Sequence, residues 1–210
     1  AIIDPVSGDN CGGASSLQDC DKEAGNQQAS ISSKIDIAGE LPMSIYMELA
    51  GEDTNDFKPY SLGNKAYNLG FFFPYLTDRS SLLFEYQHIE NAWYVHHLYQ
   101  EGYRNDLHSI GHWWGDEKLV SDGIGARILT MRYNLEFSNS YHLDVKISSL
   151  KNVNLGHESV SNESIYKTGT ELTLGLNNVS TANHLRYELN FGRDVMGEDF
   201  TRLSLSYRWQ

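Results

Sequence analysis

The alternation that decides the fold is clearest in residues 141–148, which read YHLDVKIS. In this stretch every second side chain is apolar or aromatic, and the side chains between them are polar or charged. Successive side chains of a β-strand point to opposite faces of a sheet, so this pattern predicts a strand with one apolar and one polar face. The same alternation continues in residues 172–176, 185–191 and 203–209.

The first part of the chain repeats the pattern in five further segments. They are residues 29–37, 43–49, 65–73, 81–88 and 125–137. In the last of these segments Ile128 breaks the rule, because it is an apolar residue at a polar position. The mean hydropathy of −0.46 hides the pattern, since it averages the two faces. The sequence therefore predicts nine strands, and no segment of comparable strength reads as a helix.

Two all-β architectures are compatible with such strands. A soluble sandwich buries the apolar face between two sheets, whereas a transmembrane barrel turns it toward lipid and keeps a polar lumen. The predicted strands approach the ~9–11 residues that a tilted membrane strand needs, and full charges recur on their polar side. Aromatic residues also gather near strand ends, as in an interfacial belt. These features favour an antiparallel, up-and-down transmembrane β-barrel, although the signal of each single strand is weak.

The connections between the predicted strands alternate in length. Long loops at 50–64, 89–124 and 149–169 alternate with short turns, which is typical of outer-membrane barrels. This order places residues 1–28 in an extracellular loop, residues 29–210 in the barrel with its long outer loops, and the C-terminus on the periplasmic side. An odd number of strands cannot close into an antiparallel barrel, so the sequence predicts that an N-terminal half of the same barrel is missing.

Composition excludes other classes of protein. The chain carries 16 Lys and Arg against 28 Asp and Glu, a net charge of −12, and lacks the basic surface of a nucleic-acid binder. No apolar run approaches the ~20 residues of a membrane helix. No secretory signal stands at the start of the chain, which is also what a processed chain would show.

Cys11 and Cys20 are the only cysteines, and a short polar loop separates them. In an oxidising compartment such a pair predicts a disulfide, with two free thiols as the alternative. The acidic residues around them lack the spacing of a calcium loop, and the histidines of the long loop lack the spacing of metal ligands. The sequence therefore predicts neither a metal nor a cofactor.

The loop at 89–124 is rich in Trp, Tyr, His, Arg and carboxylates. Sugar recognition uses aromatic faces for the apolar side of a pyranose, and charged or amide groups for its hydroxyls and carboxylates. Large barrels also fold such loops into the lumen as plugs. For each side chain of this loop the sequence leaves both roles open.

Several short motifs lie between the predicted strands. They are GDN at 8–10, GNQ at 25–27, IYME at 45–48, GED at 51–53, FEY at 84–86, YQEGYR at 99–104 and IGH at 110–112. In order and spacing over residues 8–135, these motifs resemble the Wzi family of outer-membrane capsule assembly proteins, and YQEGYR and IGH are the most specific of them. The remainder matches by strand pattern only, and the insertion around Cys11 and Cys20 departs from the family.

The resemblance implies an eighteen-stranded barrel, of which these nine strands would be the second half. It also implies a non-enzymatic, lectin-like role in a Gram-negative bacterium, with outer-membrane lipid and an anionic capsular or exopolysaccharide as partners. The long loop and its neighbour then supply the candidate residues for binding this polysaccharide. They are Glu52, Asp53, Tyr99, Tyr103, Arg104, His112, Trp113 and Trp114.

Two alternative functions remain open at this point. An outer-membrane lipid or peptide hydrolase would need a nucleophile beside a base, and His108 and Ser109 with Asp106 are the one candidate set. A diffusion porin would use the same charged lumen.

Overall fold

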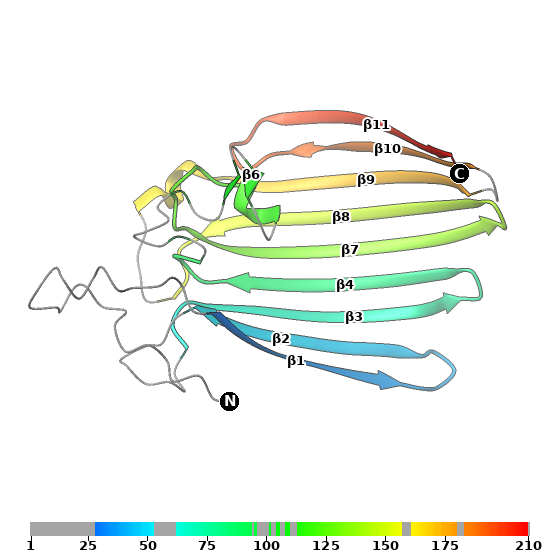
Figure 1. Cartoon of the computed structure of the whole chain (residues 1–210), viewed down its shortest axis with the longest axis horizontal. Coiled ribbons are helices and arrows are strands. Elements are labelled where there is room, and N and C mark those ends of the chain that lie inside the picture. Colours follow the sequence, from blue (N-terminus) through cyan, green and yellow to red (C-terminus); the bar gives the residue numbers. More distant parts are fainter. Residues whose placement is uncertain are drawn as a thin grey trace, which may run out of the picture.

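The computed structural model describes residues 28–52, 62–93, 95, 101, 104–105, 108–109, 113–156, 161–179 and 183–209. Nine long strands form one antiparallel sheet in the order β1-β2-β3-β4-β7-β8-β9-β10-β11, so each strand pairs with its neighbours along the chain (Figure 1). The strands are β1 (Gln28–Ile37), β2 (Met43–Glu52), β3 (Lys65–Thr77), β4 (Ser80–Ile89), β7 (Gly125–Ser138), β8 (Tyr141–Val153), β9 (Thr168–Val179), β10 (Asn183–Arg193) and β11 (Asp199–Trp209).

The prediction of an all-β, antiparallel, up-and-down sheet is confirmed, and each of the nine predicted segments lies within one strand. Several strands are longer than predicted. β8 continues to Val153, beyond the point where the simple alternation of its sequence ends. In the described part of the chain, no helix has the length and apolar character needed to cross a membrane.

The connections alternate between the two ends of the sheet, and the longest of them, 90–124 and 154–167, lie at the same end. At one end lie the turns at 38–42, 78–79 and 139–140, and at the other lie the connections that follow β4, β8 and β10 (Figure 1). We call these the short-turn end and the long-loop end. Residues 1–27, with Cys11 and Cys20, lie outside the described residues.

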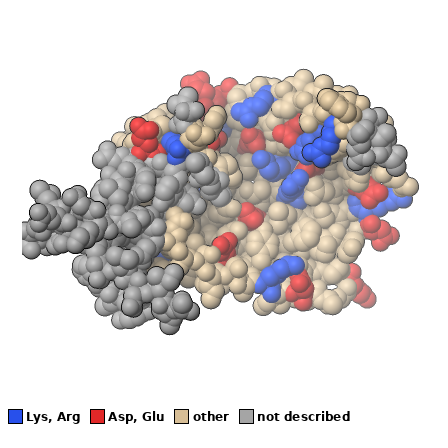
Figure 2. All heavy atoms as spheres, in the orientation of Figure 1, with Lys and Arg blue, Asp and Glu red and all other residues tan. Residues whose placement is uncertain are grey.

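The two faces of the sheet differ in chemistry. On the apolar face, large side chains are exposed, with Leu205 66% and Ile147 45% exposed. On the polar face, ion pairs join neighbouring strands: Arg132 contacts Asp144, and Lys146 Nζ lies 3.0 Å from Glu171 Oε1. Figure 2 shows Lys and Arg interspersed with Asp and Glu over the C-terminal strands.

At the long-loop end, the described part of the connection between β4 and β7 lies against the polar face, where Trp114 packs with Ile128 and Leu150. It contains a short hairpin, β5 (Arg104–Asn105) and β6 (His108–Ser109), and the 3-10 helix η3 (Trp113–Asp116). A second 3-10 helix, η4 (Ser161–Ile165), lies in the connection between β8 and β9. None of these short elements was predicted, because each is too short to show a periodic pattern.

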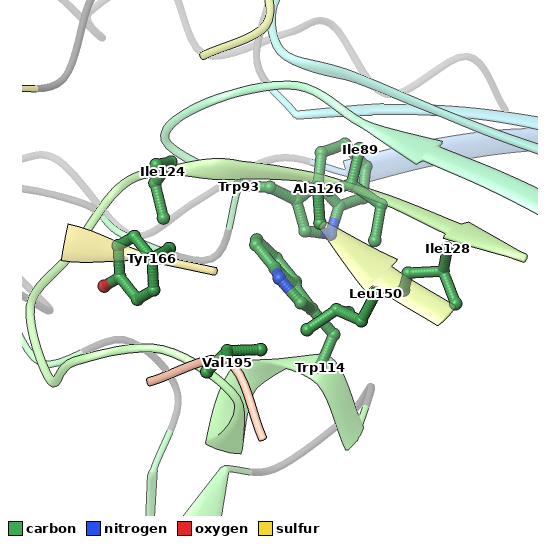
Figure 3. Close-up of a cluster of buried hydrophobic side chains, with 9 residues drawn as sticks. All are labelled: Ile89, Trp93, Trp114, Ile124, Ala126, Ile128, Leu150, Tyr166 and Val195. Atoms are coloured by element: carbon green, nitrogen blue, oxygen red, sulfur yellow. The ribbon is translucent and has the colours of Figure 1, made fainter. Parts of the chain in front are cut away.

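A buried apolar cluster lies where this connection meets the sheet, and it explains the anomaly at Ile128. Ile128 is 1% exposed and pairs across the strands with Leu150, which is also buried. Both side chains lie on the polar face, under the Trp114 ring that reaches from η3 into the centre of the cluster (Figure 3). The cluster comprises Ile89, Trp93, Trp114, Ile124, Ala126, Ile128, Leu150, Tyr166 and Val195.

Candidate functional site

The two adjacent tryptophans of η3 have different environments. Trp114 is fully buried, and its Nε1 donates a hydrogen bond to Asn152 Oδ1 on β8 at 2.9 Å. Asn152 Nδ2 in turn donates to the Glu117 carbonyl at 2.8 Å, so β8 is linked both to η3 and to the residue that follows it. Trp113 is 47% exposed. Trp114 therefore anchors the loop to the sheet, while Trp113 presents an aromatic surface to solvent.

Arg104 connects the short hairpin to η3. Its guanidinium donates to the Gly115 carbonyl at 2.5 Å and to Asp116 Oδ1 at 3.2 Å, and its side chain is 9% exposed. Asp116 Oδ1 also accepts a hydrogen bond from the Ser109 amide at 2.7 Å. A charge-assisted contact of this kind is stronger than a neutral one, so Arg104 and Asp116 hold β5, β6 and η3 together.

Gly115 of η3 lies very close to Ser109 of the short hairpin. A Cβ added at Gly115 would lie 2.7 Å from the Cβ of Ser109. Glycine is therefore required for the hairpin and the 3-10 helix to approach one another this closely.

A pocket of about 560 Å³ opens beside η3 on the polar face. Its volume falls within the ~300–1,000 Å³ range typical of small-molecule sites. Its walls come from the long connection and from the long-loop halves of the last four strands. The residues that matter chemically are Trp113, Glu117, Lys146, Glu171, Glu188 and Arg202.

Glu117 is the carboxylate that the loop contributes to this pocket. Burial raises its pKa above the ordinary value, and the nearby carboxylates of Glu171, Asp194 and Asp116 raise it further. Arg202 opposes this effect. A hydrogen-bond donor or a cation placed beside Glu117 would therefore stabilise its charged form.

Tyr166 holds the other side of the same connection. Its hydroxyl donates to Asp122 Oδ2 at 2.6 Å and accepts from the Leu119 amide at 3.1 Å. Asp122 Oδ1 also accepts from the Ile124 amide at 3.0 Å. Burial and the hydrogen bond to the Asp122 carboxylate raise the pKa of Tyr166 above its ordinary value, in keeping with a hydroxyl that donates its proton to this carboxylate.

The structure brings together three of the eight candidate polysaccharide residues. Arg104, Trp113 and Trp114 lie in or against η3. Glu52 ends β2, but its side chain lies outside the described residues. The remaining four candidates also lie outside them: Asp53, Tyr99, Tyr103 and His112.

The residues of the alternative hydrolase set are only partly described. Asn105 pairs with His108, and Arg104 with Ser109, in the short hairpin. Asp106 lies outside the described residues. Among the residues that the structure describes, no group of three or more His, Cys, Asp or Glu is arranged to hold a metal ion.

Sequence reasoning missed the strand residues of the pocket. Each of the last four strands contributes one of these residues at a polar position of its alternating sequence: Lys146, Glu171, Glu188 and Arg202. Nothing in the sequence distinguished them from the other charged residues at such positions. The available signal was Ile128 together with Leu150. Apolar residues at polar positions of adjacent strands mark the place where another segment covers the sheet, and the pocket lies next to that place.

Fold and site together define the class of the molecule: an antiparallel meander with an exposed apolar face and a polar face that carries a loop-lined pocket. The family model of the capsule assembly protein Wzi matches residues 4–209, and the chain belongs to the Wzi capsule assembly family. The family resemblance seen in the sequence is thus confirmed. No curated protein and no solved structure matched the chain.

Proposed function

We propose that this capsule assembly protein is part of a transmembrane barrel of the bacterial outer membrane, where it binds capsular or exopolysaccharide and anchors it at the cell surface without catalysis. The observation that carries the proposal is a two-faced sheet whose polar face bears an aromatic and carboxylate pocket at its long-loop end.

The apolar face supports the membrane location. Leu203, Leu205 and Trp209 on β11 are 75%, 66% and 74% exposed, and similar side chains recur on the other strands. Exposed apolar surface costs about 25 cal/mol per Å² in water, and contact with lipid removes that cost. In the proposed orientation the long-loop end faces outward and the C-terminus lies in the periplasm.

The two edges of the sheet support closure by further strands. β1 is exposed along its whole length, and β11 is exposed almost throughout. With nine antiparallel strands the two edge strands run in the same direction, so they cannot pair with each other antiparallel. A second copy in the same membrane orientation would meet the same obstacle. Strands of an N-terminal half, in an eighteen-stranded barrel, would satisfy both edges.

For polysaccharide binding we keep the eight candidate residues of the long loop and its neighbour. The exposed ring of Trp113 is suited to direct contact with a sugar. Arg104 and Trp114 contribute by holding η3 in place, since their side chains are buried in the loop.

The proposal is tested by capsule retention in cells that produce the full-length protein with Trp113→Ala. We expect capsule to be released into the medium while the amount of folded barrel, measured by heat-modifiable migration on gels, is unchanged. Trp209→Ala is the matched control, since this Trp is exposed at the opposite end of the sheet. Arg104→Ala should release capsule as well, through loss of the η3 contacts. Full retention in both loop variants would exclude the loop as the binding site.

A further inference from the structure

We propose that the pocket beside η3 binds a pyranose unit that carries no carboxylate, which makes it a subsite for the neutral or amino sugars of the polysaccharide. This inference rests on the proposed function and specifies which part of the polysaccharide enters the pocket.

The charge balance of the pocket is the first argument. Lys146 pairs with Glu171 at 3.0 Å, and Glu188 pairs with Arg186 at 2.5 Å. Arg193, which also lines the pocket, pairs with Asp199 at 2.8 Å. These cations are thus already engaged by carboxylates of the sheet.

Three charged groups of the lining remain after these pairs. They are the carboxylates of Glu117 and Asp194 and the guanidinium of Arg202. Carboxylates therefore outnumber cations, and a uronate placed among them would meet like charge. Sugar hydroxyls and ammonium groups, by contrast, donate hydrogen bonds to carboxylates.

Aromatic side chains line the pocket beside these charged groups. Trp113 lines it from η3 and Phe200 lines it from β11, so aromatic surfaces accompany the carboxylates. The C–H face of a pyranose packs on an aromatic ring while its hydroxyls point sideways, toward groups such as Glu117 and Glu171. A pocket with both features is suited to a sugar ring more than to a flat anion.

A subsite for uncharged or amino sugars is also compatible with the acidic character of the chain. A chain with a net charge of −12 repels a polyanion at long range. If the pocket holds the uncharged or amino sugars, the acidic groups of the same polysaccharide stay in solvent, where salt screens them.

The test uses full-length, detergent-solubilised protein and the purified capsular polysaccharide of the producing strain. The polysaccharide is measured in its native form and after chemical reduction of its carboxylates to alcohols. We expect the wild-type protein to bind both forms with affinities within about threefold of one another. Trp113→Leu should weaken the binding of both forms by about tenfold, as expected for loss of one stacking contact. Glu117→Gln should weaken the binding of both forms by about threefold, as expected for loss of one charge-assisted hydrogen bond.

Matched controls are Trp209→Leu and Glu198→Gln, which replace exposed residues outside the pocket lining and should leave binding unchanged. If Trp113→Leu fails to give a heat-modifiable barrel, Trp113→Phe replaces it, with a smaller loss expected. Binding that disappears on carboxyl reduction would overturn the subsite but leave the proposed function intact. Unchanged binding in the folded Trp113 and Glu117 variants would also overturn the subsite. Failure of the wild-type protein to bind the native polysaccharide would overturn both.

Discussion

Gly70 lies on the polar face at a position where no side chain fits. The Tyr46 hydroxyl on β2 donates to Glu85 Oε2 on β4 at 2.5 Å, and its ring crosses the intervening strand β3 at Gly70. A Cβ at Gly70 would lie 2.0 Å from Tyr46 Cζ. A glycine on the polar side of a strand is thus explained by a hydrogen bond that spans three strands.

Gly70→Ala is expected to destabilise the folded protein by about 1–3 kcal/mol, because the added methyl group displaces the Tyr46 ring from Glu85. The measurement is the free energy of unfolding by urea from lipid vesicles. In a Tyr46→Ala background the same substitution should be nearly neutral, since the clash is gone. Equal effects in the two backgrounds would contradict this account.

Glu117 makes the stability of the folded protein depend on pH. Its pKa in the folded state is raised above the ordinary 4.5 by burial and by neighbouring carboxylates. The stability contributed by the protonated form is therefore fully present below pH 4.5 and is lost as the pH rises through the folded pKa. Glu117→Gln should have the Tm of the parent at about pH 4 and a higher Tm at about pH 8.

This comparison isolates Glu117, because the other charged groups that face it are the same in both proteins. They are Asp116 on η3, Lys146 on β8, Glu171 on β9, Asp194 in the turn after β10 and Arg202 on β11. A Tm difference for Glu117→Gln that is constant with pH would refute the assignment.

Among the elements, β7 and β8 show how a sheet marks the place where a loop covers it. Ile128 and Leu150 replace polar residues on the polar face, and Trp114 from η3 packs over them. The backbone–backbone hydrogen bond at the end of η3 is local, from Glu117 N to the Trp114 carbonyl at 2.9 Å. The buried cluster and the two Asn152 hydrogen bonds, more than the turn itself, therefore hold η3 on the sheet.

Ile128→Ser restores the alternation of β7 and should detach η3. The loss of buried apolar contacts and the burial of a hydroxyl together cost about 2–4 kcal/mol. We expect hydrogen exchange of the Glu117 and Leu119 amides to accelerate at least tenfold, a factor equivalent to about 1.4 kcal/mol. Thr130→Ser, the next position on the same face, is the control and should leave both amides protected. Unchanged protection in Ile128→Ser would show that the cluster does not hold the loop.

For the whole molecule, the environment of the apolar face is the property that distinguishes a membrane protein from a soluble one. Leu205 and Ser206 are adjacent on β11 and point to opposite faces. Both side chains are exposed in the isolated chain, so a soluble sheet would tolerate a charge at either position about equally.

If the apolar face contacts lipid, an arginine at position 205 should destabilise the protein more than an arginine at position 206. Leu205→Arg should lower the free energy of unfolding from vesicles by about 2–4 kcal/mol near the bilayer midplane, and Ser206→Arg by about 0–1 kcal/mol. The measurement is urea unfolding of the full-length protein in lipid vesicles. Equal and small effects at the two positions would argue against a membrane-embedded apolar face.

The sequence by itself determined the nine strands, their antiparallel order and the distinction between the two faces. These properties follow from a period of two residues and from the lengths of the connections, both of which are local. The family motifs YQEGYR and IGH were also visible in the sequence, because they are contiguous.

Only the tertiary structure decided which tryptophan of η3 is buried, that Arg104 contacts Gly115 and Asp116, and which strand residues surround the pocket. Trp114 and Asn152, or Glu117 and Glu171, are far apart in the chain and meet only when the long connection folds onto the polar face. No period or spacing encodes such contacts, because they depend on the path of an irregular segment. Its docking point is set by a few apolar side chains at otherwise polar positions.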